Sequence, residues 1–143
     1  MAYDRITVRT RIRAPVARVW DAYTTSEDIT KWNFAGDDWH CPSAYVDLRP
    51  GGTFSSRMES KDGKAGFDFS GRYRDVRRHS RIEYEMDDGR GVTVLFRPRK
   101  DSTDVEVAFD PDKVYSREIQ AEGWGAILEN FRKHVEGSRA AKS

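Results

Sequence analysis

Hydrophobic and polar residues alternate at the start of the chain and then change to a helical spacing. Residues 6–12 place Ile, Val, Thr and Ile on one side and Thr and Arg on the other, which predicts a β-strand with one buried face. Apolar residues at positions 16, 19, 20 and 23 follow Pro15 at helical spacing, and Pro is common where a helix begins. Thr25 and Asp28 form a capping pattern for a second short helix, which we expect to end at Trp32.

Residues 43–109 lose the helical period and consist of alternating segments between turn sequences. The turns are marked by Gly, Asp or Ser at 50–52, 61–63, 87–89 and 100–102, which is typical of an antiparallel meander. One face of the meander is apolar and the other is charged, so another layer must cover the apolar face. The residues expected on the apolar face are Phe54, Ser56, Met58, Phe67, Phe69, Gly71, Tyr73, Ile82, Tyr84, Met86, Val92, Val94, Phe96, Val105, Val107 and Phe109.

The covering layer is a long helix predicted over residues 116–136. Steps of about 100° per residue place Trp124 and Leu128 beside an apolar stripe and charged residues opposite it. The stripe consists of Ile119, Gly123, Ile127, Phe131 and Val135. A glycine in this stripe predicts that a backbone, a side chain or a ligand approaches the helix closely at Gly123, whereas Gly125 turns toward the polar side. Gly123→Leu is therefore expected to damage folding or ligand uptake, and Gly125→Ala to be neutral or mildly stabilising.

Together these elements predict a single α+β domain over residues 1–137. Its order is one strand, two short helices, about six further antiparallel strands and one long helix. Gly137 follows the helix as a natural C-cap, and residues 138–143 are expected to form a disordered tail.

Charge and cysteine content exclude several classes of protein. The 143 residues include 25 Lys and Arg against 24 Asp and Glu, so no overall field attracts nucleic acid. The basic run at 72–81 is interleaved with acids and lacks an aromatic row, which indicates a solvated face. The single Cys41 excludes an internal disulfide, and its spacing from Asp37, Asp38 and His40 is poor for a metal site. No apolar run reaches the length of a membrane span, and we expect a cytoplasmic protein. We expect no cofactor. The protein is expected to be either a monomer or a homodimer.

Several short motifs carry a resemblance over nearly the whole chain. They are Ala14-Pro15 with Val19-Trp20, Lys31-Trp32, Asp38-Trp39-His40-Cys41-Pro42, Asp47-Leu48-Arg49-Pro50-Gly51-Gly52, Gly66-Phe67-Asp68-Phe69, Phe109-Asp110-Pro111, Gln120, Gly123-Trp124 and Ile127-Leu128-Glu129-Asn130-Phe131. Together they resemble the family of activators of heat-shock-protein-90 ATPase, and most closely its single-domain bacterial branch. The resemblance implies the helix-grip fold of the START and birch-pollen-allergen superfamily, which includes polyketide cyclases. In that fold a curved sheet of about seven strands wraps the C-terminal helix and leaves a cavity between them.

The resemblance implies three functions that the residues leave open. We favour the binding of a small apolar or aromatic molecule, because the inner face of the predicted sheet is rich in aromatic side chains. A chaperone-activating interaction is the first alternative. A cyclase or hydrolase is the second, and it requires an ionisable residue inside the cavity. The carboxylates of the meander fall on its polar face, so we predict no catalytic residue.

The cavity of the implied fold is expected to be lined by residues of the meander, the last helix and the segment before the meander. They are Trp32, Phe34, Trp39, Phe54, Met58, Phe69, Tyr73, Tyr84, Phe96, Gln120, Gly123, Trp124, Ile127 and Phe131. The first three lie by the cavity mouth in this fold, and they either form a lid or pack into the core.

Three polar residues fall on or near the inner stripe of the last helix. Gln120, Asn130 and His134 either bond to groups within the protein or, in the case of Gln120, present an amide to a ligand. Asp47 and Arg49 lie two apart on a predicted strand, and we interpret them as an ion pair.

Overall fold

The predicted strands form one antiparallel sheet in the computed structural model, which describes residues 4–141 and the side chains of residues 4–137. The strand order is β1-β7-β6-β5-β4-β3-β2, so the first strand pairs with the last. The strands are β1 (Ile6–Ile12), β2 (Trp39–Val46), β3 (Thr53–Ser60), β4 (Gly66–Arg77), β5 (Arg81–Met86), β6 (Gly91–Pro98) and β7 (Thr103–Phe109). The helices are α1 (Val16–Thr24), α2 (Ser26–Ile29) and α3 (Arg117–Ala141).

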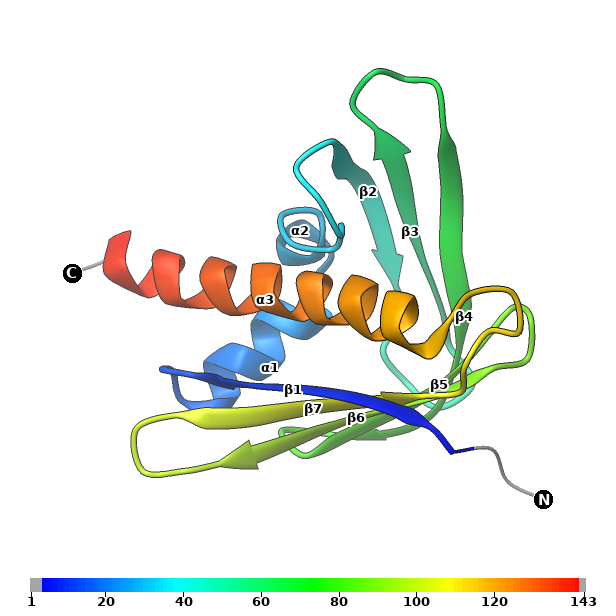
Figure 1. The fold of residues 1–143 in the computed structure, drawn as a ribbon. Helices are drawn as coiled ribbons and strands as arrows, with labels where there is room; N and C mark the ends of the chain where they lie inside the picture. Colours follow the sequence, from blue (N-terminus) through cyan, green and yellow to red (C-terminus); the bar gives the residue numbers. More distant parts are fainter. Residues whose placement is uncertain (1–3, 142–143) are drawn as a thin grey trace.

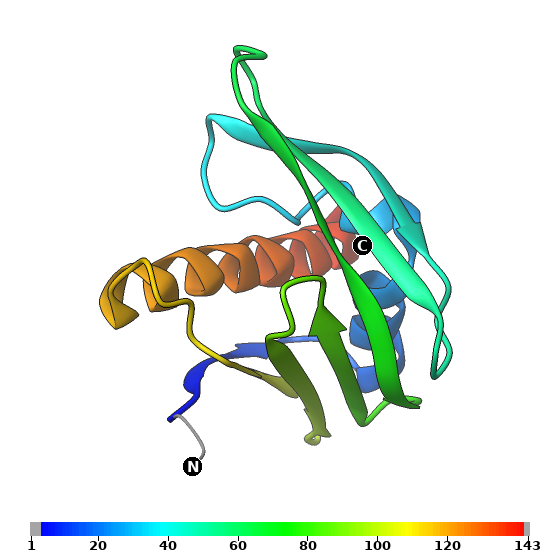
Figure 2. The ribbon, with the colours of Figure 1, turned by 90° about the vertical axis from the view of Figure 1, so that its right-hand side faces the viewer.

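The sheet is strongly curved, and α3 lies along its concave side (Figure 1). In this view β1, β7 and β6 pass below α3, whereas β2, β3 and β4 rise above it. The turned view shows the sheet curling around the helix, with α1 and α2 near the C-terminal end of α3 (Figure 2). The predicted helix-grip fold is confirmed.

Alternation along the strands produces the core. In β5, β6 and β7 every second residue is buried, and the residues between them are more exposed. Phe109 of β7 and Phe131 of α3 are completely buried, so sheet and helix share one apolar layer. Trp124 of α3 stacks on Phe109 with ring centroids 4.1 Å apart. The meander residues were assigned to the correct face because the pleat fixes the side-chain period at two.

The buried stripe of α3 is rotated from the predicted one. Ile119 is 57 % exposed, whereas Gln120, Leu128, Phe131 and Val135 are buried. Residues four apart on a helix drift by about 40° per step, so a stripe built only from such steps leaves the core. The observed stripe contains a step of three from Leu128 to Phe131, which turns it back. The helix was predicted correctly, but its inner face near the N-terminal end was not.

The two glycines of α3 have roles opposite to those predicted. A Cβ atom on Gly123 would meet no atom within 4 Å outside the local helix backbone, whereas one on Gly125 would lie 3.9 Å from Cγ1 of Val8. Gly125 therefore faces β1, where a small residue lets helix and strand approach each other. Gly123 faces open space, so no described backbone or side chain makes the close approach predicted there, and an approach by a ligand stays a prediction.

α3 also ends later than predicted. It continues through Gly137 to Ala141. Gly137 is not among the glycines with positive φ, which a glycine C-cap requires, so it extends the helix instead of ending it. Of the predicted tail, residues 138–141 belong to α3 and residues 142–143 lie outside the described residues.

The segment between β1 and β2 differs from the prediction at the second helix. α2 ends at Ile29, before Trp32. Thr25 occupies the N-cap position of α2 but makes no side-chain capping hydrogen bond. The Asp28 carboxylate instead lies 2.8 Å from Nε2 of His134, which joins α2 to α3.

β2 begins at Trp39, earlier than the meander start expected at residue 43. Its pairing with β3 shifts register between His40 and Ser43, as expected for a β-bulge. The predicted ion pair of Asp47 and Arg49 forms with an N–O distance of 3.0 Å, but it lies in the turn after β2 and not within a strand.

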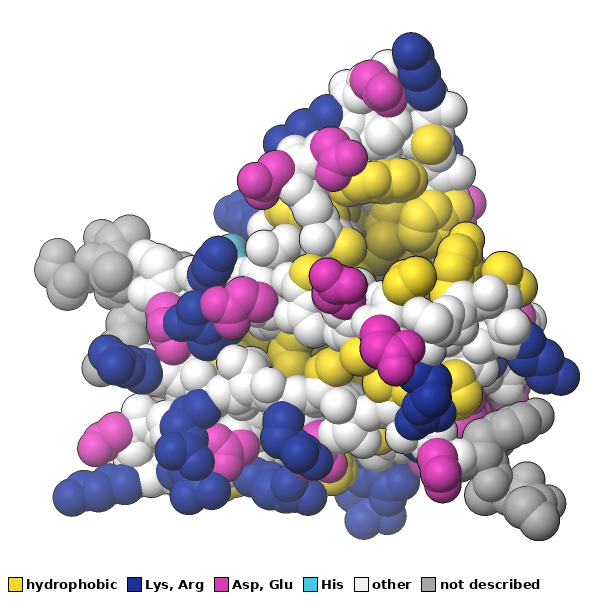
Figure 3. Space-filling view, in the orientation of Figure 1, with side chains coloured by type: hydrophobic (Ala, Val, Ile, Leu, Met, Phe, Trp, Pro, Cys, Tyr) yellow, Lys and Arg dark blue, Asp and Glu magenta, His cyan; other side chains and the backbone are white. Residues whose placement is uncertain are grey.

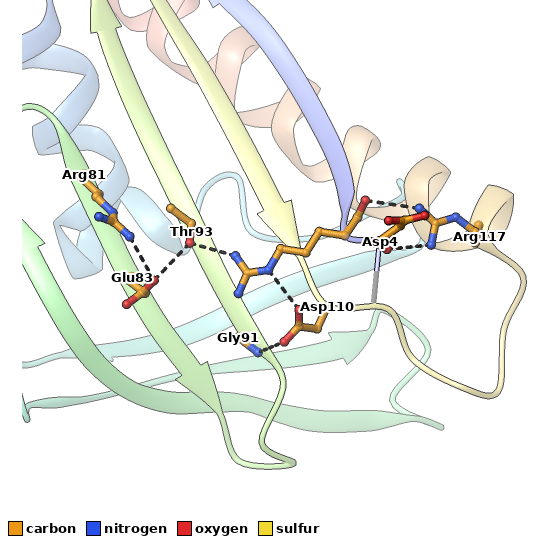
Figure 4. Close-up of polar contacts among 8 residues, drawn as sticks. Asp4, Arg81, Glu83, Gly91, Thr93, Asp110 and Arg117 are labelled. Atoms are coloured by element: carbon orange, nitrogen blue, oxygen red, sulfur yellow. Dashed lines mark hydrogen bonds and ion pairs between the residues drawn. The ribbon is translucent and has the colours of Figure 1, made fainter. Parts of the chain in front are cut away.

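A polar network fixes the connection from β7 to α3 (Figure 4). Arg5 donates from Nε to Asp110 at 3.0 Å and from Nη1 to Oγ1 of Thr93 at 2.9 Å. Asp110 also accepts the backbone N–H of Gly91 at 2.9 Å. Arg117 at the start of α3 donates to the carbonyl of Arg5 at 3.2 Å. The network therefore ties the start of β1 to the start of α3, and it holds the sheet edge over which the helix lies.

Candidate functional site

A cavity of about 280 Å³ lies between the curved sheet and α3. The space-filling view shows it as a hollow lined by hydrophobic side chains, above α3 and in front of the upper strands (Figure 3). Phe67 on β4 belongs to its lining and is 49 % exposed. The lining residues are Tyr23, Ile29, Trp32, Asn33, Val46, Phe54, Ser56, Met58, Phe67, Phe69, Tyr73, Ile82, Tyr84, Met86, Arg90, Val107, Trp124, Ile127 and Leu128.

The structure brings many of the predicted site residues together at this cavity. Those that line it are Trp32, Phe54, Met58, Phe69, Tyr73, Tyr84, Trp124 and Ile127. The strand residues among them share one face of the sheet, and Phe54 contacts Tyr84 with ring centroids 4.8 Å apart. The wall on the sheet side is therefore largely aromatic and continuous.

The remaining predicted residues lie elsewhere. Phe96 is buried beside Trp20, and Phe131 is buried with its ring 4.8 Å from that of Trp32. Gly123 faces open space outside the lining. These residues are part of the core or the helix surface, so predicting the inner face of an element is not enough to place a residue at the cavity.

Of the three aromatic residues expected at the cavity mouth, one lines the cavity and two lie outside its lining. Trp32 is buried, and its indole N–H donates to the carbonyl of Ala22 at 3.0 Å, so it forms a fixed wall. Phe34 is half-buried outside the lining. Trp39 packs against Phe67, with ring centroids 5.9 Å apart, and it also lies outside the lining. Of these aromatic side chains, Phe67 is the one that is both exposed and part of the cavity.

The polar residues predicted on the inner side of α3 bond within the protein. Gln120 donates from Nε2 to the carbonyl of Tyr115 at 2.9 Å and accepts the backbone N–H of Asp112 at 2.6 Å. Asn130 donates to the carbonyl of Phe34 at 2.6 Å. His134 is bonded to Asp28 of α2, so the three side chains join α3 to α2 and to neighbouring loops.

Sequence reasoning missed several polar groups of the lining. Tyr23 on α1 and Asn33 after α2 belong to it, and neither was assigned to the cavity. Ser56 shares the apolar face of β3 with Phe54 and Met58, so the alternation along this strand indicated that its side chain faces the cavity. Arg90 follows the turn between β5 and β6, where no period indicates the direction of a side chain.

The tyrosines of the lining stay protonated. Burial raises the pKa of Tyr23, Tyr73 and Tyr84 above the usual value. Nearby tyrosines raise the pKa of Tyr23 and Tyr84 further, and Asp47 does so for Tyr73. At neutral pH the three phenols are therefore uncharged groups that can donate hydrogen bonds.

Among the described residues of the lining, one is charged, and its neighbours compensate it. Nε of Arg90 lies 2.8 Å from Asp88, and its Nη2 lies 3.9 Å from Asp112. Partial burial acts to raise the pKa of Asp88, but hydrogen bonds from the backbone and guanidinium of Arg90 lower it overall. The carboxylate of Asp88 is therefore charged at neutral pH and offsets the guanidinium of Arg90.

Acid–base chemistry has little support at this cavity. Its lining, drawn from the described residues, contains no Asp, Glu or His, and the raised pKa of each tyrosine keeps its phenol protonated and makes it a weak acid. No group of three His, Cys, Asp or Glu within the described part of the chain could hold a metal ion. Cys41 is buried, and burial raises the pKa of its thiol, as expected of an unreactive cysteine.

Comparisons with known proteins find relatives over most of the chain. The family model described as activator of Hsp90 ATPase homolog 1-like protein matches residues 13–136. An AHSA1-like protein from Aeromonas hydrophila, solved in solution, is 38 % identical, with 94 % of this chain and 93 % of that chain covered and a TM-score of 0.89. A protein from Cytophaga hutchinsonii is 39 % identical over 95 % of this chain and 94 % of its own, with a TM-score of 0.80.

More distant structures share the fold alone. A crystal structure from Nitrosomonas europaea is 21 % identical, covers 98 % of this chain and 99 % of its own, and has a TM-score of 0.82. No curated protein matches the chain. Among the residues that the structure describes, no helix has the length and apolar character needed to cross a membrane.

Proposed function

The chain belongs to the activator of Hsp90 ATPase homolog 1-like family, and we propose that it binds a small apolar or aromatic molecule between the sheet and α3. The observation that carries this proposal is the cavity of about 280 Å³ with its mainly apolar and aromatic lining. Small-molecule sites are usually concave and apolar with a few polar groups, and this cavity has that composition.

The size of the cavity supports this function over a packing defect. Protein interiors are close-packed, and voids larger than a single water molecule are rare. A water molecule occupies about 30 Å³ of the liquid, so this cavity is several times larger. Its volume is just below the range of about 300–1,000 Å³ that is usual for ligand pockets, so we infer a small ligand of about two rings.

Native mass spectrometry of protein purified gently from its own organism tests the proposal. We expect a bound small molecule that organic solvent releases, and its return should raise the melting temperature. Ile127→Trp should block the cavity and abolish both effects, because Ile127 lines it. Ile119→Trp is the matched control, since Ile119 lies on the same helix but is 57 % exposed and outside the lining.

Two results would overturn the proposal. One is protein that is always empty and whose melting temperature no lipid or aromatic metabolite changes. The other is Ile127→Trp protein that is folded by circular dichroism and still carries the same molecule as the wild type.

A second candidate function is an interaction that stimulates a chaperone ATPase, as the description of the family names. Its support is a short exposed apolar segment at the start of α3, with Val114 79 %, Tyr115 60 % and Ile119 57 % exposed. Adding the chain to the chaperone of its own organism and measuring ATP turnover tests this function, and an unchanged rate would remove it. We propose a cytoplasmic location, which its single, buried cysteine supports.

A further inference from the structure

The cavity contains a set of neutral polar groups without a partner in the protein. They belong to Tyr23, Asn33, Ser56, Tyr73 and Tyr84. None of these side chains makes a hydrogen bond to another described residue. In the described part of the chain, the fully enclosed side-chain atoms that lack a partner belong to two arginines and one histidine outside this cavity. The polar atoms of these five lining residues are therefore not fully enclosed, and we infer that they face the cavity.

These groups are built into the walls and are not surface residues. Asn33, Ser56, Tyr73 and Tyr84 are between 4 % and 7 % exposed. Buried polar groups in proteins almost always have a hydrogen-bond partner, because leaving one unpaired costs free energy. For these side chains the partner must be something that occupies the cavity.

The three tyrosines come from different elements and lie close to one another. Tyr73 and Tyr84 are directly paired between β4 and β5, with ring centroids 6.5 Å apart. Tyr23 reaches the same cavity from α1, so residues of a helix and of two strands supply the three phenols of its lining. The phenols thus form one group of neutral donors within the apolar wall.

The charges around the cavity do not favour an ionic ligand. Of the lining residues that the structure describes, Arg90 alone is charged, and Asp88 and Asp112 already compensate it. A buried carboxylate or ammonium without an opposite charge would be costly. A neutral oxygen atom, in contrast, would match the phenols, the hydroxyl and the amide.

We propose that the cavity selects uncharged ligands that carry a carbonyl or hydroxyl oxygen on an apolar body of about two rings. This inference rests on the proposed function and narrows it to a chemical class. A hydrocarbon of the same shape would displace water from the polar groups without replacing its hydrogen bonds, whereas the oxygen atom restores them. A site with polar groups that a ligand leaves unpaired discriminates strongly against that ligand.

Three ligands of similar shape test the selection. Benzophenone carries a carbonyl oxygen, diphenylmethane lacks one, and diphenylacetate is an anion. With titration calorimetry at pH 7.5, we expect benzophenone to bind about 10-fold more tightly than diphenylmethane, since one or two net hydrogen bonds separate them. Diphenylacetate should bind most weakly.

The double variant Tyr73→Phe/Tyr84→Phe removes two donors and keeps both rings. The double variant should lower the affinity for benzophenone about 3- to 10-fold. Its affinity for diphenylmethane should be unchanged or slightly higher. Tyr45→Phe is the matched control, because Tyr45 is 58 % exposed and outside the lining, and it should keep the wild-type preference. Without ligand, the double variant should melt no lower than the wild type, because its lost hydroxyls bond to no described residue.

Each other outcome has a definite meaning. If benzophenone and diphenylmethane bind equally, or if diphenylacetate binds best, the selection is refuted while the binding function stands. If the double variant keeps the full preference or is markedly less stable without ligand, the phenols are not the selecting groups and the inference fails. If none of the three ligands binds, this inference is refuted together with its premise for ligands of this size.

Discussion

The same substitutions at Gly123 and Gly125 should change the stability of the protein differently, because the two glycines lie on different faces of α3. Alanine at either position should raise the free energy of unfolding by about 0.5–1 kcal/mol, because glycine inside a helix costs this much relative to alanine. Neither new Cβ atom is crowded, since the one at Gly123 meets open space and the one at Gly125 lies 3.9 Å from Val8. For a chain of 143 residues this gain corresponds to a melting temperature about 2–4 °C higher.

Leucine makes the difference between the two sites visible. Gly125→Leu directs further carbon atoms toward Val8 on β1, and overpacking of this kind typically costs about 1–3 kcal/mol. Its gain in helix propensity offsets part of that cost, so we expect a net loss of about 0.5–2 kcal/mol. Gly123→Leu should keep the gain of the alanine variant, because its Cβ atom points into open space.

Urea unfolding followed by circular dichroism measures both pairs, provided that the m-value stays constant. Gly137→Ala serves as a control for helix propensity alone, since a Cβ atom at that position also meets nothing within 4 Å. If Gly123→Leu proves as destabilising as Gly125→Leu, the face assigned to each glycine is wrong and the argument built on it fails.

Three further predictions concern single side chains. Asp110→Ala should lower the free energy of unfolding by about 1.5–3 kcal/mol in urea titrations, because it leaves the N–H of Gly91 and a guanidinium without their acceptor; a loss below about 0.5 kcal/mol would contradict this. Hydrogen bonds, chiefly from Arg11, lower the pKa of Asp104 in the folded protein to about 2 from an ordinary 3.8, so its contribution is present above pH 3.8 and is lost as the pH falls toward 2. Asp104→Asn should therefore be less stable than the wild type at pH 6, with a difference that shrinks between pH 4 and pH 2, and a constant difference would count against the pair. Cys41 should react with iodoacetamide at pH 8 about 10-fold or more slowly in the folded protein than in urea, because burial raises the pKa of its thiol and restricts access, and equal rates would refute this.

The sheet side of the fold and of the cavity could be predicted well from the sequence. Successive side chains of a strand point to opposite faces, so alternation assigns each residue to one face without a measured angle. Phe54, Met58, Tyr73 and Tyr84 were therefore expected on the inner face, and all four belong to the lining of the cavity. Phe96 shows the limit of this reasoning, because its face is correct but the space above it is filled by Trp20 and other core residues.

The helix and loop sides were less predictable for a physical reason. A helical stripe drifts with each step of four, so a small error in its phase moved Gly123 onto the inner face and Gly125 off it. Asn33 and Arg90 lie in segments without any period, and only tertiary packing directs them to the cavity. Resemblance to the family supplied the existence of a cavity but not the groups that face it.

The pairing of β1 with β7 has a consequence for how the chain is made. Arg5 and Asp110 are neighbours in the folded protein but 105 positions apart in the sequence, and the intervening residues must leave the ribosome before the two can meet. At about 5–20 residues per second, this delay is roughly 5–20 s. During that time the apolar side of β1 has neither its partner strand nor α3 to cover it. β1 is therefore expected to stay uncovered until β7 and α3 have been made, and its alternating arginines help to keep the waiting segment from associating with other chains.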